Sequence, residues 1–173
     1  EGTFVDQDGD GSGLTDKDRI HYKDPVADFY FGIGTSLQYK NLGFSFSGRA
    51  NFGNWVYNNV KSENAVWERM YRPEGPYLGN VTSEVTEVDF DFPWYWSSYY
   101  VENGSFFRMD NITLNYTFDK LFKEKASLML SGTVNNAFVI TNYSGLDPEV
   151  STGIDNRIYP RPRVYVLGVS LTF

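Results

Sequence analysis

The last eleven residues, 163–173, alternate between apolar side chains and small or polar ones. The apolar set is Tyr165, Leu167, Val169, Leu171 and Phe173, and the opposite set is Val166, Gly168, Ser170 and Thr172. A period of two residues is that of a β-strand with one apolar face. The last strand of an outer-membrane β-barrel has this pattern, because it must pair with the first strand to leave no open edge in lipid. We therefore expect a membrane strand and a function in transport.

The same alternation recurs upstream and predicts an all-β chain with five antiparallel strands. The predicted strands are 28–40, 42–57, 105–118, 126–142 and 163–173. Each is long enough for the roughly 9–11 residues that a tilted strand needs to cross the hydrocarbon layer. Short connections at 40–41 and 119–125 alternate with long ones at 58–104 and 143–162. This alternation is typical of a transmembrane antiparallel β-barrel with short periplasmic turns and long extracellular loops.

A soluble antiparallel sandwich with one solvated face, stabilised by calcium and binding carbohydrate through its aromatic residues, would give a similar alternation. Against this alternative, the apolar faces are long and aromatic, and the opposite faces carry small and amide side chains rather than Lys and Glu. Aromatic residues make up 18% of the chain, which suits a barrel with aromatic girdles. Because small barrels need about eight strands, we expect these five to be the C-terminal piece of a longer protein.

Composition excludes several classes of protein. The chain has no Cys and a single His, His21, which argues against thiol chemistry, a zinc site and histidine-based catalysis. The net charge of −7 argues against a nucleic-acid partner. The first residues, Glu1 to Phe4, lack the basic start and apolar core of a signal peptide. For an outer-membrane protein we expect that segment to have been removed, or to belong to an upstream part of the protein.

An acidic segment near the N-terminus resembles the opening of a calcium-binding loop. Asp6, Asp8 and Asp10 are followed by a glycine, in the spacing D-x-D-x-D-G. Carboxylates at positions one, three and five converge on a cation in such loops. The twelfth position is a lysine, so Asp16 or Asp18 beside it would have to complete the site. We expect structural Ca²⁺ here, the alternative being an acidic surface turn.

Two sets of side chains in the long connections are candidates for binding. The aromatic residues expected to contact a ligand or a partner are Trp67, Trp94, Tyr95, Trp96, Tyr99 and Tyr100. The alternative is that these rings pack on each other or sit in the interfacial girdle. Arg157, Arg161 and Arg163 precede the last strand, where they would anchor the loop at the membrane rim, pair with loop carboxylates or bind an anionic group. No catalytic residue is predicted.

Several segments together resemble the C-terminal end of the SusC-like (SusC/RagA) TonB-dependent outer-membrane transporters of Bacteroidetes. They are DQDGDGSGLTDKDR at 6–19, GNWVYN at 53–58, the stretches 100–118 and 134–150, and YPRPRVYVLGVSLTF at 159–173. Residues 59–99 match nothing in the resemblance, as expected of a loop that faces the substrate. Gly13 is an extra residue relative to the usual spacing before Asp18, which affects the geometry of the acidic loop.

The resemblance implies that residues 1–173 are the last five strands of a plugged barrel of about 22 strands. Its partners would be the rest of the barrel and plug, a SusD-like surface lipoprotein, the TonB–ExbB–ExbD complex and outer-membrane lipid. The cargo would be oligosaccharides or peptides, and the protein would not be an enzyme. The location would be the bacterial outer membrane, with a periplasmic C-terminus. The apolar face from Tyr165 to Phe173 would be the signal read by the barrel-assembly machinery.

Overall fold

The computed structural model describes residues 4–11, 15–70, 80–88, 95–120, 125–156 and 159–173. The chain forms two compact units. The first, here called the sheet unit, comprises Val26–Asn54, Asn103–Glu149 and Tyr159–Phe173. The second, here called the loop unit, comprises Glu1–Pro25, Trp55–Glu102 and Val150–Ile158. No described helix is long and apolar enough to cross a membrane.

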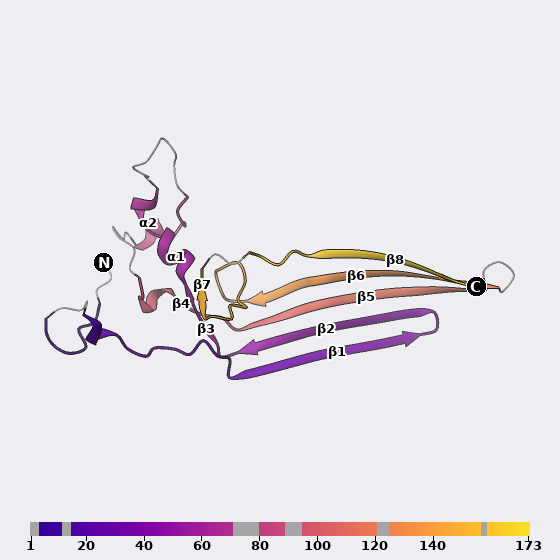
Figure 1. Ribbon diagram of the computed structural model, residues 1–173, viewed down its shortest axis with the longest axis horizontal. Helices are drawn as coiled ribbons and strands as arrows, with labels where there is room; N and C mark the ends of the chain where they lie inside the picture. The colour runs from indigo at the N-terminus through magenta and orange to yellow at the C-terminus, as the bar shows by residue number, and fades with distance from the viewer. Residues whose placement is uncertain (1–3, 12–14, 71–79, 89–94, 121–124, 157–158) are drawn as a thin grey trace. The chain divides into compact units, whose positions relative to one another are not determined.

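The sheet unit is one antiparallel sheet of five strands in the order β1-β2-β5-β6-β8 (Figure 1). The strands are β1 (Phe29–Tyr39), β2 (Leu42–Phe52), β5 (Phe106–Lys120), β6 (Ala126–Thr141) and β8 (Val164–Thr172). A strand is present at each of the five predicted places, and the antiparallel pairing is confirmed, although the second strand is shorter than predicted. The tight turn between β1 and β2 falls where it was predicted, with Lys40 at a positive φ of 52°.

The register gives the sheet one apolar and one polar face. In one row across the strands, Phe46, Ile112, Val134 and Tyr165 are aligned, and in the next Phe44, Leu114, Gly132 and Leu167. The polar rows between them contain Ser45, Ser47, Asn111, Thr113, Thr133 and Asn135. On the polar face Asn111 Nδ2 donates to Ser47 Oγ at 2.6 Å, and the hydroxyls of Thr113 and Thr133 lie 2.9 Å apart. Cross-strand hydrogen bonds therefore tie the polar face together.

The pairing is interrupted where β2, β5 and β6 lie side by side. The register shifts between Met109 and Asn111, leaving Asp110 as the extra residue of a bulge. On β6, Asn136 has a positive φ of 50° near the same point. Bulges of this kind re-aim side chains at the ends of strands. This one lies among the charged residues described below.

The predicted strand 42–57 is wrong at its C-terminal end. β2 stops at Phe52 because Gly53 has a φ of +91°, a conformation that glycine adopts without a steric penalty. The chain then enters β3 (Trp55–Asn58), which belongs to a separate sheet of order β4-β3-β7. β4 is Val101–Asn103, and β7 is Ile154–Asp155, parallel to β3.

The rest of the loop unit contains short helices and a small core. They are η1 (Asp16–Asp18), α1 (Asn59–Asn64), η2 (Trp67–Arg69), α2 (Val85–Val88) and η3 (Ser98–Tyr100). The Asn58 side chain caps α1 by accepting a hydrogen bond from the backbone N–H of Lys61 at 2.9 Å. Tyr57, Ala65 and Tyr100 form the buried core.

Candidate functional site

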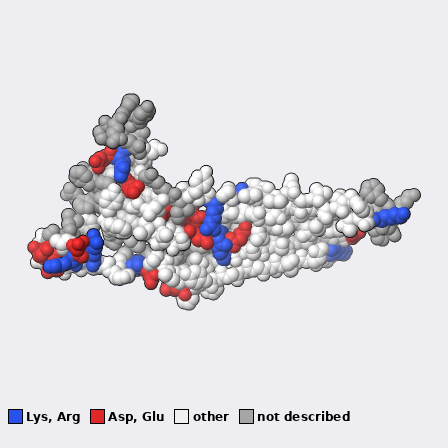
Figure 2. Space-filling model, viewed as in Figure 1, with Lys and Arg blue, Asp and Glu red and all other residues white. Residues whose placement is uncertain are grey.

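The apolar face of the sheet unit is exposed along its two outer strands. Leu167, Val169 and Tyr165 of β8 are 89%, 74% and 70% exposed, and the apolar side chains of β1 are exposed as well. Figure 2 shows that the charged side chains along the visible strands gather mainly in one group, described in the next paragraph. Contiguous apolar patches above a few hundred Å² are rare on soluble monomers. This face therefore requires an apolar neighbour.

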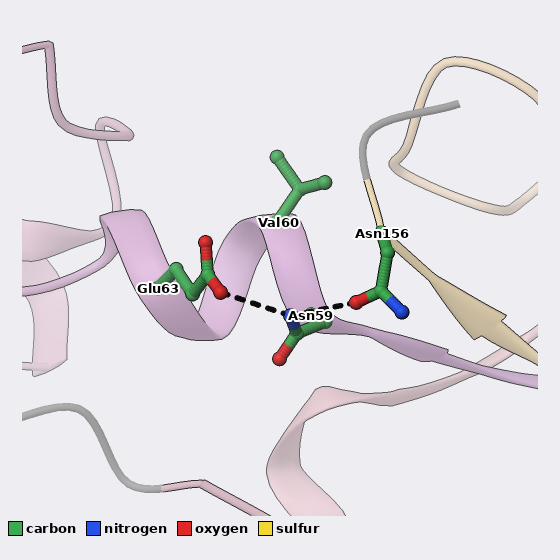
Figure 3. A pocket seen from close by; sticks show the side chains of 4 residues that line it. All are labelled: Asn59, Val60, Glu63 and Asn156. Carbon is green, nitrogen blue, oxygen red and sulfur yellow. Dashed lines mark hydrogen bonds between the residues drawn. The ribbon is translucent and has the colours of Figure 1, made fainter. Parts of the chain in front are cut away.

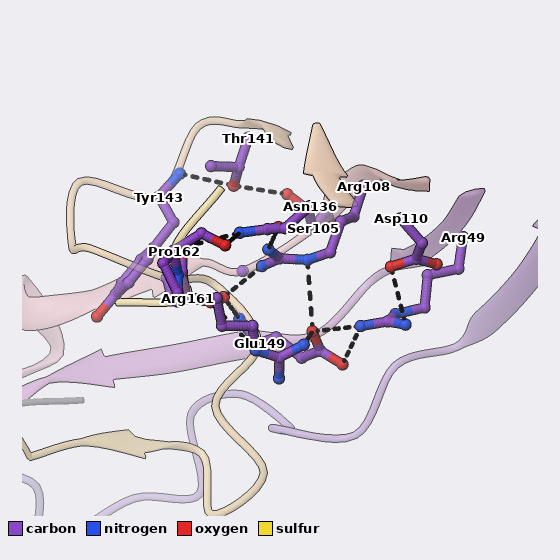
Figure 4. Close-up of polar contacts among 12 residues, drawn as sticks. Arg49, Ser105, Arg108, Asp110, Asn136, Thr141, Tyr143, Glu149, Arg161 and Pro162 are labelled. Atoms are coloured by element: carbon purple, nitrogen blue, oxygen red, sulfur yellow. Dashed lines mark hydrogen bonds and ion pairs between the residues drawn. The ribbon is translucent and has the colours of Figure 1, made fainter. Parts of the chain in front are cut away.

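A cluster of arginines and carboxylates lies on the polar face of the sheet, around the bulge (Figure 4). Arg49 of β2 lies opposite Arg108 of β5 in the register. Arg49 Nη1 pairs with Asp110 Oδ1 at 3.0 Å, and its Nη2 bonds both carboxylate oxygens of Glu149, at 3.1 and 2.9 Å. Arg108 Nη2 bonds Asp147 Oδ1 at 2.6 Å, and both side chains are nearly fully buried. We call Arg49, Arg108, Arg161, Asp110, Asp147 and Glu149 the arginine cluster.

Residues near the start of β8 complete the arginine cluster. Arg161 Nη1 lies 2.7 Å from Glu149 Oε2, so the expected pairing of this arginine with loop carboxylates is confirmed. At the bulge, Asn136 Oδ1 accepts from Arg108 Nη1 at 2.7 Å, and Asn136 Nδ2 donates to the Arg161 carbonyl at 2.8 Å. The cluster therefore connects β2, β5 and β6 with both ends of the long connection between β6 and β8.

The loop unit presents aromatic side chains over an aromatic core. Trp96 is 68% exposed and stacks on Tyr57, with ring centroids 5.5 Å apart and planes inclined by 24°. The backbone N–H of Trp96 donates to Tyr57 Oη at 2.9 Å. Tyr99 packs edge-on against buried Tyr100, with centroids 5.1 Å apart. Tyr95, Trp96 and Tyr99 are thus exposed together, and we call these three residues the aromatic surface.

Not every predicted aromatic contact residue belongs to this surface. Trp67, on η2, is 36% exposed, less than the residues of the aromatic surface. Tyr100 is fully buried and supports Tyr57 and Tyr99 from below. Burial raises the pKa of the Tyr100 phenol to about 12, with smaller contributions from Tyr57, Tyr99 and Glu84. Trp94 lies outside the described residues.

Beside the aromatic core, one lysine is held between two glutamates. Lys61 Nζ lies 2.6 Å from Glu84 Oε1 and 3.2 Å from Glu102 Oε1. Burial alone would lower the lysine pKa, but the bonds to Glu84 and Glu102 outweigh burial and raise it. The ammonium also lies 5.7 Å from the Tyr99 ring centroid. The charges next to the aromatic surface are thus paired within the unit.

A small open pocket lies at the start of α1 (Figure 3). It has a volume of about 220 Å³ and is lined by Asn59, Val60, Glu63 and Asn156. Asn59 Nδ2 donates to Glu63 Oε1 at 3.1 Å and to Asn156 Oδ1 at 2.8 Å. The polar groups of the lining are already bonded to one another, so the pocket offers little for specific recognition.

The acidic loop brings together three of its five candidate ligands. Carboxylate oxygens of Asp6, Asp8 and Asp18 lie within 4.8 Å of one another. Asp16 pairs instead with Arg19, and Asp10 is not in the group. Backbone N–H groups of Gln7 and Thr15 donate to Asp18 and lower the pKa of its carboxyl. Lys17 Nζ lies 3.4 Å from Asp8 Oδ2.

Comparison with known proteins identifies the relatives of this chain. No family model matches it. TonB-dependent receptor SusC of Bacteroides thetaiotaomicron is 39% identical over 100% of this chain and 18% of its own length. The chain is homologous to one segment of the SusC-type TonB-dependent receptors. TonB-dependent receptor P26 of Formosa agariphila is 30% identical over 98% of this chain and 19% of its own length. The chain thus spans less than a fifth of the curated relatives it matches.

Two solved structures have a fold similar to that of this chain. A structure of the RagAB peptide transporter matches with a TM-score of 0.69 and 22% identity, covering 87% of this chain and 18% of that one. The 'closed-closed' state of the RagAB peptide importer matches with a TM-score of 0.66 and 18% identity, at the same coverage of both chains. The resemblance stated from the sequence is confirmed. The curated relatives are named as receptors, in agreement with the prediction that the chain is not an enzyme.

The sequence did not single out most of the arginine cluster. Arg49, Arg108, Asp147 and Glu149 were absent from the predicted site residues. One signal was available for Arg49, a charged residue on a strand face that otherwise carries small and amide side chains. The alternation puts Arg108 with the apolar residues of its strand, and only the bulge brings it opposite Arg49.

Proposed function

We propose that this chain is the C-terminal part of an outer-membrane TonB-dependent transporter and supplies the last five of about 22 barrel strands. The complete protein imports oligosaccharides or peptides together with a SusD-like surface lipoprotein. TonB–ExbB–ExbD supplies the energy through a plug that lies outside this chain.

The observation that carries the proposal is the apolar face of the sheet unit. Apolar side chains recur in register on one face of all five strands, and those of the outer strands β1 and β8 are exposed. Among the described residues, the sheet unit has no second sheet of its own to cover that face, which speaks against a soluble sandwich. In an outer-membrane barrel, the apolar neighbour of this face is the lipid of the membrane. The polar face then lines the lumen.

The two edges of the sheet fit a larger barrel. β1 and β8 are the outer strands of the described sheet, and each pairs with one neighbour. Open edges do not occur in the hydrocarbon layer, so each requires a further strand. We assign β8 to pair with the first strand of the barrel and β1 to pair with the preceding one. Tyr165, Leu167, Val169, Leu171 and Phe173 then form the assembly signal.

The aromatic surface is the proposed contact site for cargo or for the lipoprotein partner. Tyr95, Trp96 and Tyr99 are exposed, and the nearby charges of Lys61 and Glu102 are paired with each other. Ring faces of this kind bind apolar faces of sugars and anchor protein interfaces. The solved RagAB relatives are named as a peptide transporter, which keeps peptides beside oligosaccharides as a cargo class.

The test is purification of the full-length protein from native membranes in detergent, with identification of co-purifying polypeptides by mass spectrometry. The proposal expects a barrel-and-plug polypeptide that contains this sequence, together with a surface lipoprotein. Uptake of labelled cargo by cells should stop when TonB is deleted. A species of this chain's size that stays soluble without detergent would contradict the proposal.

We also propose that the acidic loop binds Ca²⁺ through Asp6, Asp8 and Asp18. Three carboxylates within 4.8 Å fit part of the six to eight oxygens that Ca²⁺ takes, the rest being backbone or solvent oxygens. Bound Ca²⁺ would stiffen the loop and would compete with Lys17 for Asp8. Calcium titration of the full-length protein tests this, with Asp8→Asn as the disabling variant and Asp16→Asn as the matched control. Equal calcium affinity in both variants would contradict the site.

A further inference from the structure

The last strand, β8, pairs with β6 from Ser127 opposite Thr172 to Asn135 opposite Val164. Along these pairs β8 carries apolar side chains on one face and mostly small or polar ones on the other. A slip by one residue would exchange the two faces, so the pattern excludes it. A slip by two residues would keep every apolar side chain on the apolar face. The alternation alone therefore leaves the register of β8 open to slips by two.

The middle of the β6–β8 pair opposes such a slip only weakly. Gly168 lies opposite Ser131, and a side chain at position 168 would overlap the Ser131 hydroxyl. A slip by two would bring Val166 or Ser170, which have side chains, opposite Ser131. The hydroxyl, however, can turn to another rotamer at small cost. The register therefore needs a further determinant elsewhere along the strand.

Asn136 provides contacts at the point where the backbone pairing of β6 and β8 ends (Figure 4). Its Nδ2 donates to the carbonyls of Arg161 at 2.8 Å and Pro162 at 3.3 Å, and its Oδ1 accepts from Arg108 Nη1 at 2.7 Å. Pro160 and Pro162 have no backbone N–H, so this segment cannot continue a complete ladder. One amide side chain thus joins β5, β6 and the residues that lead into β8.

The side chain of Arg161 restricts the contact of Asn136 to one register. Backbone carbonyls occur at every residue, so Asn136 alone would also accept a slipped strand. Arg161 Nη1, however, lies 2.7 Å from Glu149 Oε2, and its Nε lies 3.7 Å from Asp147 Oδ2. Asp147 is itself held by the buried Arg108, at 2.6 Å. A slip by two residues displaces Arg161 by about 7 Å, which is more than the span of either ion pair.

We propose that Asn136 and Arg161 set the register of β8 against β6, and we call these two residues the register anchor. The anchor thereby also sets the height at which the free edge of β8 meets its next neighbour. Closure of a barrel requires a fixed stagger between strands, so a slip by two at β8 would misalign that contact. This consequence rests on the proposed function of β8 as the closing strand, whereas the register itself does not.

The experiment reads the register from disulfides between β6 and β8, formed in cells in a full-length protein without other cysteines. Cysteines at Met129 and Ser170, which lie opposite each other, report the native register. The pair at Met129 and Thr172 reports a slip by two in one direction, and the pair at Thr133 and Val164 reports a slip in the other. In the native register these two pairs are diagonal neighbours, with Cβ atoms about 7–8 Å apart. A disulfide needs about 4 Å, so they form only in a slipped strand.

Two variants disable the register anchor in different ways. Asn136→Asp keeps an acceptor for Arg108 and tolerates the positive φ of 50°, but it cannot donate to the carbonyls before β8. Arg161→Gln removes the ion pairs. The matched control is Asn135→Asp, the same substitution at the exposed neighbouring residue. The ratio of slipped to native disulfide should rise roughly five- to thirtyfold in either disabling variant and stay at the wild-type value in the control.

The disulfide ratio separates a register anchor from a contact that only stabilises the fold. A ratio at the wild-type value in both disabling variants would overturn the inference, even if less protein accumulates, because a lower yield alone reports lost stability. Slipped and native disulfides of equal yield in the wild type would overturn it as well. Fractionation of the same cells tests the proposed function separately. A raised ratio in a protein found outside the outer membrane would support the anchor and contradict the proposed function.

Discussion

Tyr57 contacts both the indole ring and the backbone of Trp96. The two rings are stacked with centroids 5.5 Å apart, and Tyr57 Oη accepts a hydrogen bond from the Trp96 backbone N–H at 2.9 Å. Trp96 has a φ of +64°, which is unfavourable for a residue with a side chain. A strained backbone that keeps an exposed indole in a fixed place is typical of a binding surface.

The backbone strain at Trp96 predicts an unusual order of stability for two variants, with glycine more stable than alanine. Both Trp96→Gly and Trp96→Ala lose the stacking on Tyr57, but only glycine adopts this φ without penalty. The glycine variant should therefore be the more stable of the two by about 1 kcal/mol. Denaturant unfolding of the two variants measures this difference. A more stable alanine variant would show that the backbone is not strained at Trp96.

The buried pair of Arg108 and Asp147 predicts a large loss of stability. Asp147→Asn leaves the arginine charge buried without its partner and should lower the free energy of unfolding by roughly 3 kcal/mol. The exposed pair of Asp16 and Arg19 supplies the comparison, and Asp16→Asn should cost less than about 1 kcal/mol. Thermal unfolding of both variants tests this. Equal costs would mean that Asp147 is open to water.

The phenol of Tyr100 predicts a change at alkaline pH. Burial raises its pKa in the folded protein to about 12, from 10.0 for the free side chain. Because the pKa is higher in the folded protein, the unfolded chain loses this proton first. The free energy of unfolding is therefore unaffected by Tyr100 below pH 10 and falls as the pH rises towards 12. Tyrosinate absorbance of the wild type minus that of Tyr100→Phe should show one phenol titrating near the upper value. A difference curve centred near 10 would contradict its burial.

The two faces of β8 predict unequal costs for the same substitution. Arg at Leu167 or Val169 should cost roughly 2–4 kcal/mol if these residues meet the middle of the bilayer. Arg at Ser170, on the polar face, should cost much less. Unfolding of the three variants in lipid vesicles measures the costs. Equal values on both faces would contradict the assigned orientation.

Sequence reasoning recovered the strands of the sheet unit because their signal is local. Alternation along β8 or β1 is visible without knowing what each strand pairs with. The same reasoning wrongly extended β2 past Phe52. The alternation continues there, but the chain turns at Gly53, whose backbone has a positive φ that the pattern does not reveal. It also missed the bulge at Asp110, which arises from the mismatch between three paired strands.

The candidate sites were only partly predictable, for a related reason. Motif spacing identified Asp6 and Asp8, but it left Asp16 and Asp18 as equal candidates. The choice of Asp18 depends on backbone N–H groups of Gln7 and Thr15 that meet its carboxylate. Glu149 lies 100 residues from Arg49 in the chain, so spacing carries no signal for their contact.

The central claim is that the apolar face of the sheet meets lipid and the polar face meets water in the lumen. The chain contains no Cys, so single cysteines at Leu167 and Ser170 can carry spin labels in a full-length protein without other cysteines. The most direct measurement is the accessibility of each label, in lipid nanodiscs, to oxygen dissolved in lipid and to a water-soluble nickel complex. The account predicts that the label at Leu167 meets mainly oxygen and the label at Ser170 mainly the nickel complex. Water-exposed labels at both positions would contradict it.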